Sequence, residues 1–274
     1  MAELTFWTNP MSRGRTVRWA LEEVRAATGL DYETVLLDFA TTAKAPEYLA
    51  VNPMGKVPAI RHGNVVVTEG AAICAYLGDA FPDAGLAPPV DAPERGAYYR
   101  WLFFAAGPIE AAVTATAMRF DVPVEREGTV GWGSMTRVLD TLEGAVAGSG
   151  WLAGDRFTMA DLYVGASLGW GMMFGAIPKR PAFEDYTGRA LSRPAAVRAR
   201  EIDDALMPKE TAEGSTSTPG PRPTGARFPS CWKSSGCPTR RTRSRSARAP
   251  STRTGTARSR RTGRSRRSGT GTRA

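Results

Sequence analysis

A serine and two arginines occupy the start of the first predicted helix. Ser12, Arg13 and Arg15 follow the short apolar run at 4–7 and open the stretch 12–27, in which apolar residues recur at helical spacing. A serine hydroxyl in this position can accept a hydrogen bond from an unpaired backbone N–H of the helix start. The arginines add positive charge where the helix dipole is already positive, which is unfavourable by roughly a few tenths of a kcal/mol each. We therefore expect a negatively charged group to face this helix start.

Two further motifs place polar groups at the ends of predicted strands. In "NPMGKVPAI" (52–60), Pro58 begins a strand beside a bend, which proline can do on any sheet edge. In "VTEGAAICAYL" (67–77), Glu69 ends a strand and Gly70 opens a helix. The backbone N–H groups of that helix start form an anion site suited to a carboxylate, although an acid in this position can also simply balance the helix dipole.

These motifs require a small α/β unit to position them. The periodicities of the first part of the chain predict the order β-α-β-α-β-β-α, with strands at 4–7, 32–39, 57–61 and 65–69 and helices at 12–27, 45–52 and 70–81. An "HGN" turn joins the last two strands as a hairpin, and the first crossover is expected to be right-handed. After the proline-rich stretch 82–93, the chain to about 207 carries only helical periodicity. The predicted fold class is therefore α/β plus all-α.

The positive charge of the chain is unevenly distributed. The formal net charge is +9, but 16 of the 36 Lys and Arg residues and one of the 27 acids lie after residue 210. The body 1–210 therefore holds 20 basic and 26 acidic residues, a net charge of −6, while 211–274 has a net charge of +15. We expect the body to be a soluble, mildly acidic protein, and a nucleic-acid role is expected only of the basic segment.

A single histidine excludes several classes of enzyme. Ser-His-Asp and Cys-His hydrolases and multi-histidine metal sites need histidine partners that this chain lacks. His62 stands in the hairpin turn, where a solvent-facing side chain is expected.

The three cysteines have no metal-ligand spacing, so no metal is expected, and Cys74 is expected to be a small buried hydrophobe. No signal-peptide pattern or run of about eighteen apolar residues is found, which predicts a cytoplasmic protein without membrane contact.

Three pieces of the first domain resemble the glutathione transferase superfamily, and the resemblance extends from residue 3 to about 207. They are the opening strand–turn–helix with Ser12, "NPMGKVPAI" and "VTEGAAICAYL". The resemblance implies a thioredoxin-like glutathione-binding domain at 1–81, a linker at 82–93 and an all-helical domain with the electrophile site at 94–210.

The resemblance also assigns roles at the glutathione site. It implies a cis Val57–Pro58 bond that turns the Val57 backbone towards the cysteinyl part of bound glutathione. Glu69 would hold the α-amino group of the γ-glutamyl residue, and the helix start at Gly70 would hold its carboxylate. The family usually has serine or threonine in place of Gly70, so one hydroxyl hydrogen bond is missing here. The full set of glutathione-binding residues is expected to be Arg13, Asn52, Lys56, Val57, Pro58, Glu69 and Gly70.

A further expectation concerns the group that stabilises the glutathione thiolate. The free thiol has a pKa of about 8.5, and a hydroxyl donor at a helix start lowers it by stabilising S⁻. Family members use Tyr, Ser or Cys after the first strand; here the strand ends in Trp7 and no cysteine is near, so Ser12 is the expected catalytic residue. An alignment without gaps can place Met11 at that position instead, which would leave Ser12 as an N-cap and Asn9 or Thr8 as the donor.

The resemblance implies a glutathione transferase that conjugates the glutathione thiolate to a hydrophobic electrophile, with glutathione as co-substrate and a homodimeric assembly. The alternative is a non-catalytic glutathione-binding carrier or regulatory protein on the same fold. In the helical domain, Thr158 and Asp161 match a capping box of the family. The aromatic cluster at 98–104 is expected to divide between core, dimer contact and cleft.

The segment 211–274 consists mainly of Arg, Ser, Thr, Gly, Pro and Ala, and it lacks Leu, Ile, Val, Met and Tyr. Such a composition cannot bury enough apolar surface to fold alone, so a disordered basic tail is expected. Arginine-rich segments of this kind bind phosphate backbones; the alternative is a frameshift product without an evolved function. Any nucleic-acid binding is expected to be salt-sensitive and to disappear on truncation at 210.

Overall fold

The computed structural model describes residues 4–207, and the expectations for 211–274 fall outside that range. Its first part has the predicted order of elements: β1 (Leu4–Thr8), α1 (Gly14–Thr28), β2 (Tyr32–Leu36), a 3-10 turn (Thr42–Lys44), α2 (Pro46–Leu49), β3 (Ala59–His62), β4 (Val65–Thr68), α3 (Gly70–Ala80) and a second 3-10 turn (Pro82–Ala84). The strand order is β2-β1-β3-β4, with β1 and β2 parallel and the other two pairs antiparallel. This mixed sheet confirms the α/β part of the predicted fold.

The second strand is shorter than the sequence pattern predicted, because the chain turns at Asp38. The strand β2 ends at Leu36, whereas the pattern predicted 32–39. The Asp38 carboxylate accepts hydrogen bonds from the backbone N–H groups of Ala40 and Thr41, both at 2.9 Å. An aspartate that bonds the backbone two and three residues ahead favours a turn over continued sheet pairing.

His62 is half-buried and lies in a strand, so the expectation of a solvent-facing turn residue was wrong. It is the last residue of β3, and its Nδ1 lies 3.0 Å from the hydroxyl oxygen of Tyr76 in α3. The imidazole also stacks on Phe81, with ring centroids 5.3 Å apart. The predicted hairpin does form, with Gly63 in the left-handed region at a φ of 55°. His62 still belongs to the strand that precedes this turn, and it therefore packs against α3.

The second part of the described chain is all helical, as expected. Its elements are α4 (Glu94–Phe104), a π-helical turn (Ala105–Ile109), α5 (Glu110–Met118), a 3-10 turn (Val124–Thr129), α6 (Met135–Val146), α7 (Met159–Met173), α8 (Pro181–Leu191) and α9 (Pro194–Ala205). The elements from α4 to α5 form one continuous helical stretch, and Pro108, which has no backbone N–H to donate, lies inside the π-helical turn. By length and composition alone this stretch could cross a membrane; in the protein it packs against α6 and α7.

Asp161 joins three segments of the helical part. Its carboxylate accepts hydrogen bonds from the backbone N–H groups of Leu152 at 2.7 Å and Thr158 at 2.9 Å, and from the hydroxyl of Tyr186 at 2.8 Å. The Thr158 side chain caps α7, which confirms the predicted capping box. Burial raises the pKa of the Asp161 carboxyl, and these hydrogen bonds oppose that shift.

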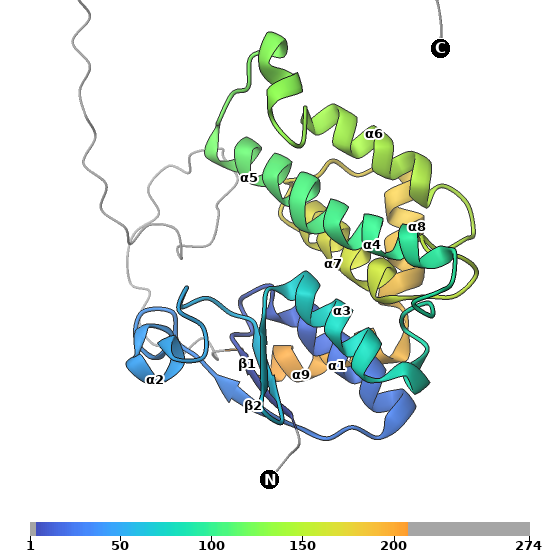
Figure 1. Ribbon diagram of the computed structural model, residues 1–274. Coiled ribbons are helices and arrows are strands. Elements are labelled where there is room, and N and C mark those ends of the chain that lie inside the picture. The colour runs from blue at the N-terminus through green and yellow to red at the C-terminus, as the bar shows by residue number, and fades with distance from the viewer. Residues whose placement is uncertain (1–3, 208–274) are drawn as a thin grey trace, which may run out of the picture. The chain divides into compact units, whose positions relative to one another are not determined.

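The helix α1 is shared by both parts of the described chain. It packs against β1 and α3 of the first part and against α7 and α9 of the second, and Figure 1 shows α1 and α9 side by side. One hydrophobic core runs through both parts and includes Phe6, Val17, Ile73 and Leu162. Cys74 is fully buried in this core, as predicted.

A buried ion pair holds α1 against α9. Arg18 and Asp203 are 2 % and 1 % exposed, and Arg18 Nε donates to Asp203 Oδ1 at 3.1 Å. The same guanidinium donates to the hydroxyl of Thr34 at 2.7 Å and lies over the ring of Phe6. Burial raises the pKa of Asp203, and the Arg18 charge opposes that shift. Each charge is tolerated in the interior because the other is present.

We predict that Arg18→Met lowers the free energy of unfolding by about 3–5 kcal/mol, because it leaves the Asp203 carboxyl buried without its partner. The double variant Arg18→Met/Asp203→Leu is expected to lose less than this single variant, since neither charge then remains in the interior. Urea titrations of the full-length proteins measure both values.

The matched control is Arg15→Met. It breaks the 2.7 Å pair between Arg15 and Asp204, which joins the same two helices at the surface, and it is expected to cost about 1 kcal/mol or less. A double variant of the buried pair that loses at least as much stability as Arg18→Met would contradict the prediction.

Candidate functional site

Three sequence motifs meet at one end of the sheet. Trp7 of β1 pairs with Ala59 of β3, and Ala59 pairs with Thr68 of β4. The segments next to this row are therefore neighbours: the turn after β1, the Val57–Pro58 bend before β3, and Glu69 after β4. Because adjacent strands are about 4.8 Å apart, β1 and β4 are separated by roughly 10 Å here.

The turn between β1 and α1 is held by Asn9. Its Nδ2 donates to the carbonyl of Leu37 at 2.8 Å, and its Oδ1 accepts the N–H of Met11 at 2.8 Å. Its carbonyl accepts both the N–H and the hydroxyl of Ser12, at 3.0 and 2.6 Å. Local bonds of this kind favour a turn over helix. The helix α1 consequently begins at Gly14, two residues later than predicted.

Ser12 has a half-buried side chain whose hydroxyl both accepts and donates. It accepts the backbone N–H of Gly14 at 2.9 Å and donates to the carbonyl of Asn9 at 2.6 Å. The first bond satisfies a donor at the helix start, as a capping serine does. To donate to a ligand atom the hydroxyl must leave the Asn9 carbonyl, and a charged acceptor compensates for that loss because bonds to charged groups are stronger.

The other candidates, at the end of β1 and in the turn, are less suited to donate to a ligand. Thr8 is fully buried, and its Oγ1 has no hydrogen-bond partner among residues 4–207. Both ends of the Asn9 amide are already bonded. Met11 is 48 % exposed but has no side-chain donor. Ser12 is therefore the residue of this turn that combines partial exposure with a hydroxyl donor.

Arg13 and Arg15 contact the helical part of the chain. Arg13 forms an ion pair with Glu110, the first residue of α5, and the two side chains are 39 % and 44 % exposed. Arg15 donates from Nε to the carbonyl of Pro10 at 2.6 Å and pairs with Asp204. The negative groups at this helix start thus come from the protein itself, and a ligand anion would have to share Arg13 with Glu110. No sequence pattern links Arg13 to Glu110, which lies 97 residues away.

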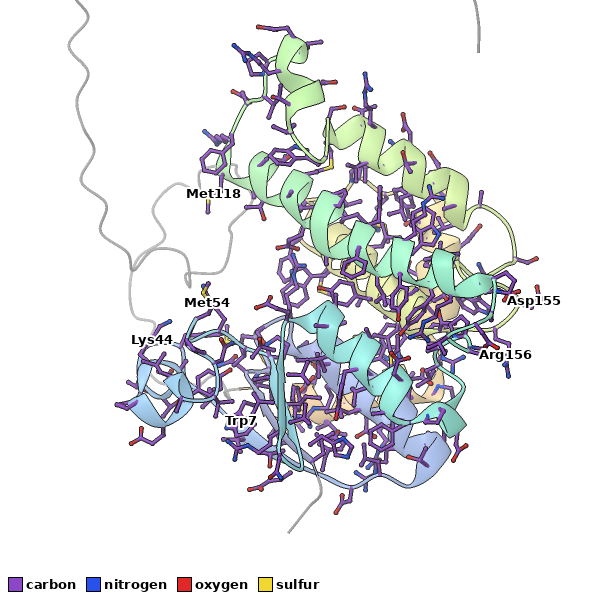
Figure 2. The ribbon with its side chains drawn as sticks, in the orientation of Figure 1. Trp7, Lys44, Met54, Met118, Asp155 and Arg156 are labelled. Atoms are coloured by element: carbon purple, nitrogen blue, oxygen red, sulfur yellow. The ribbon has the colours of Figure 1, made fainter. Side chains whose placement is uncertain are left out.

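The loop before β3 has the expected cis bond, but one of its expected ligand-binding side chains bonds within the loop instead. The Val57–Pro58 bond is cis, as the resemblance implied. Asn52 is buried; its amide donates to the carbonyl of Lys56 at 2.7 Å and accepts the N–H of Met54 at 3.1 Å. The Asn52 side chain therefore shapes the loop, whereas Lys56 is exposed. Figure 2 shows Met54 and Lys44 beside α2 in this region.

Glu69 has an unusual backbone at the start of α3. Its φ is 67° and its ψ is 120°, a conformation that costs a residue with a side chain about 1–3 kcal/mol. The N–H of Ile73 donates to the Glu69 carbonyl at 2.9 Å, so the N–H groups of residues 70–72 lie at the open end of the helix. The Glu69 carboxylate is exposed and has no ion pair or hydrogen bond within residues 4–207. This backbone conformation places the Glu69 carboxylate and the N–H groups of residues 70–72 at the end of the sheet. Sequence patterns do not reveal it.

A pocket of about 350 Å³ lies elsewhere in the helical part, between the end of α5 and the start of α6. Its walls include Ala112, Thr116, Phe120, Trp132 and Ser134, and none of the predicted site residues lines it. Among the described residues, no group of three or more His, Cys, Asp or Glu side chains is placed to hold a metal ion.

The start of α1 has no room for a side chain at position 14. A Cβ on Gly14 would lie 2.0 Å from Thr8 Oγ1 and 2.9 Å from Ser12 Oγ. We predict that Gly14→Ala lowers the free energy of unfolding by about 1–3 kcal/mol, because β1 and the turn must move apart. The control is Gly144→Ala in α6, where no neighbouring atom lies within 4 Å of the Cβ position and a gain of up to about 1 kcal/mol is expected. Urea unfolding compares the variants; equal stabilities would refute the steric argument.

Comparison with known proteins finds similarity in both parts of the chain. Residues 2–79 match the family "Glutathione S-transferase, N-terminal domain", and residues 132–194 match "Glutathione S-transferase, C-terminal domain". Glutathione S-transferase GstA of Escherichia coli O157:H7 is 34 % identical over 146 residues, which cover 52 % of this chain and 72 % of that protein. Glutathione S-transferase GST-4.5 of Xanthomonas campestris is 28 % identical over 151 residues, covering 53 % and 74 %.

Solved structures show the same fold. A glutathione transferase from Methylococcus capsulatus matches with a TM-score of 0.61 and 30 % identity, covering 74 % of this chain and 99 % of that one. A sphingomonad glutathione S-transferase complexed with glutathione matches with a TM-score of 0.58 and 28 % identity, covering 73 % and 98 %. Because both domain families, the relatives' sequences and the fold agree, the chain belongs to the glutathione S-transferase superfamily.

Proposed function

We propose that the protein transfers glutathione to a hydrophobic electrophile. The observation that supports this most directly is the pairing across β1, β3 and β4, which brings the Ser12 turn, the cis Val57–Pro58 bend and Glu69 to one end of the sheet. Relatives that are named glutathione S-transferases favour an enzyme over a non-catalytic carrier or regulatory protein. One of the similar structures holds glutathione.

The chemical groups of glutathione match those at the end of the sheet. The Val57 main chain beside the cis bond can pair with the cysteinyl backbone. The Glu69 carboxylate, which has no partner within residues 4–207, suits the α-amino group, and the N–H groups of residues 70–72 suit the γ-glutamyl carboxylate. The exposed Lys56 is a cation available to the glycyl carboxylate. No metal is needed for this reaction.

Ser12 stabilises the thiolate in this proposal. Its hydroxyl turns from the Asn9 carbonyl to the sulfur and donates a hydrogen bond to S⁻, which lowers the thiol pKa and raises the thiolate fraction at neutral pH. The thiol proton passes to solvent. The sulfur then forms a bond to the electrophilic carbon, and from an aryl halide the halide leaves with the bonding electrons.

In this proposal the electrophile binds against the helical part of the chain. The helix α5 begins at Glu110, which contacts Arg13 beside the Ser12 turn, and its other end lines the pocket of about 350 Å³. We also propose a cytoplasmic location, because glutathione and other thiols are kept reduced there. Conjugation of hydrophobic electrophiles would give the protein a role in detoxification.

We predict that Ser12→Ala moves the titration of bound glutathione to higher pH by about one unit or more, because the thiolate loses a hydrogen-bond donor. Thiolate absorbance against pH measures this shift, and turnover of a generic aryl halide at neutral pH is expected to fall about tenfold with it. The control is Thr8→Val, which removes the buried hydroxyl at the end of β1 and is expected to leave the titration unchanged. Coinciding curves for wild type and Ser12→Ala would show that the serine is not the donor.

The proposed enzyme is a homodimer. Tyr99 and Phe103 of α4 are neighbours, with ring centroids 6.4 Å apart, and are 38 % and 69 % exposed. On the edge strand β4, Val65 and Val66 are 48 % and 40 % exposed. Neighbouring exposed apolar side chains, as in these two pairs, are typical of protein–protein interfaces, whereas single exposed apolar residues are ordinary at a protein surface.

The variant Phe103→Glu is expected to sediment at the mass of a monomer, because it would bury a charge in the interface. Val124→Glu replaces an exposed apolar residue of a 3-10 turn and serves as the control that keeps the dimer mass. A wild-type protein that sediments as a monomer at micromolar concentration would exclude the proposed assembly.

A further inference from the structure

We infer that Tyr163 of α7 is a glutathione-binding residue, whose phenolic hydroxyl donates a hydrogen bond to the γ-glutamyl carboxylate at the start of α3. The inference rests on the proposed function and adds a contact from the helical part that none of the sequence motifs contains.

Tyr163 lies against the first residue of α3. A Cβ on Gly70 would be 3.2 Å from Tyr163 Cε2 and 3.4 Å from its phenolic oxygen. The helices α3 and α7 pack against each other, which holds the ring in this place. Because Gly70 has no side chain, the phenol can lie close to the backbone there. The Tyr163 hydroxyl therefore lies close to where the hydroxyl of a serine or threonine at position 70 would otherwise be.

The Tyr163 hydroxyl is available to a ligand. It forms no hydrogen bond with another residue in the range 4–207. Unlike the hydroxyl of Tyr98, it is not one of the side-chain polar atoms that are fully buried without a hydrogen-bond partner. Three other phenols donate within the protein, namely those of Tyr32, Tyr48 and Tyr186. The half-buried Tyr163 therefore differs from these, because its hydroxyl is not fully buried and has no partner among the described residues.

The surroundings keep this phenol protonated. Burial raises the pKa of Tyr163 to about 12, the neighbouring Cys74 acts in the same direction, and Arg13 opposes the shift. Glu110 and Glu69 also raise it. At neutral pH the hydroxyl is consequently a donor, and a phenolate is not formed.

A carboxylate fits this group of donors. The N–H groups of residues 70–72 and the Tyr163 hydroxyl all donate, and the dipole of α3 adds partial positive charge at the same end. Glu69, immediately before them, is an exposed acceptor. The γ-glutamyl α-carbon carries a carboxylate and an amino group side by side, which matches donors next to an acceptor.

The test measures the affinity of the full-length protein for two peptides by calorimetry. They are glutathione and γ-aminobutyryl-cysteinyl-glycine, which lacks only that carboxylate. Tyr163→Phe is expected to weaken glutathione binding about tenfold and binding of the second peptide less than about twofold, because a bond to a charged group is lost with the first peptide alone. Tyr76→Phe removes a hydroxyl that contacts His62, and this matched control is expected to bind both peptides like the wild type.

Gly70→Ala tests the same contact without changing Tyr163. Its methyl group would stand 3.2 Å from Tyr163 Cε2, so the ring must shift by a few tenths of an ångström; a smaller but equally selective loss of glutathione affinity is expected. Equal weakening of both peptides, or an unchanged glutathione affinity in Tyr163→Phe, would overturn the inference. A wild-type protein that does not bind glutathione would instead overturn the proposed function, and the inference with it.

Discussion

The buried ion pair between Arg18 and Asp203 is the contact on which the arrangement of this protein depends. An unpaired charge in the interior costs several kcal/mol, so neither α1 nor α9 can keep its charge there without the other. These are the first and last helices of the described chain, and the pair therefore ties its two ends together. Two further pairs lie along the same contact: Glu22 with Arg198 at 2.9 Å, and the surface pair of Arg15 with Asp204.

The position of α1 also determines the site, because the turn with Ser12 leads into this helix. The helical part then reaches the turn directly: Glu110 pairs with Arg13, and Tyr163 reaches the start of α3 beside Gly70. The sheet supplies the remaining groups, since the pairing of β1, β3 and β4 aligns their ends. Both parts of the described chain thus contribute residues to the candidate site, although the sequence motifs lie in the first part.

Local chemistry explains which predictions succeeded. The β-hairpin, the capping box at Asp161 and the burial of Cys74 depend on residues close together in the chain, and each was confirmed. The end of β2 and the orientation of His62 were wrong, because a turn held by Asp38 and packing against α3 decided them. The spacing of apolar residues along the chain gives no information about either of these contacts.

The sequence by itself determined the types of group at the end of the sheet: a hydroxyl at Ser12, a proline at position 58 that begins a strand, and an acid at Glu69 before a helix. Only the tertiary structure decided which of these groups remain unpaired. It assigned Arg13 to Glu110 and Asn52 to its own loop, and it left Glu69 and the Tyr163 hydroxyl without protein partners among the described residues. The physical reason is that hydrogen bonding and burial depend on neighbours in space, and for Arg13 that neighbour lies 97 residues away in the chain.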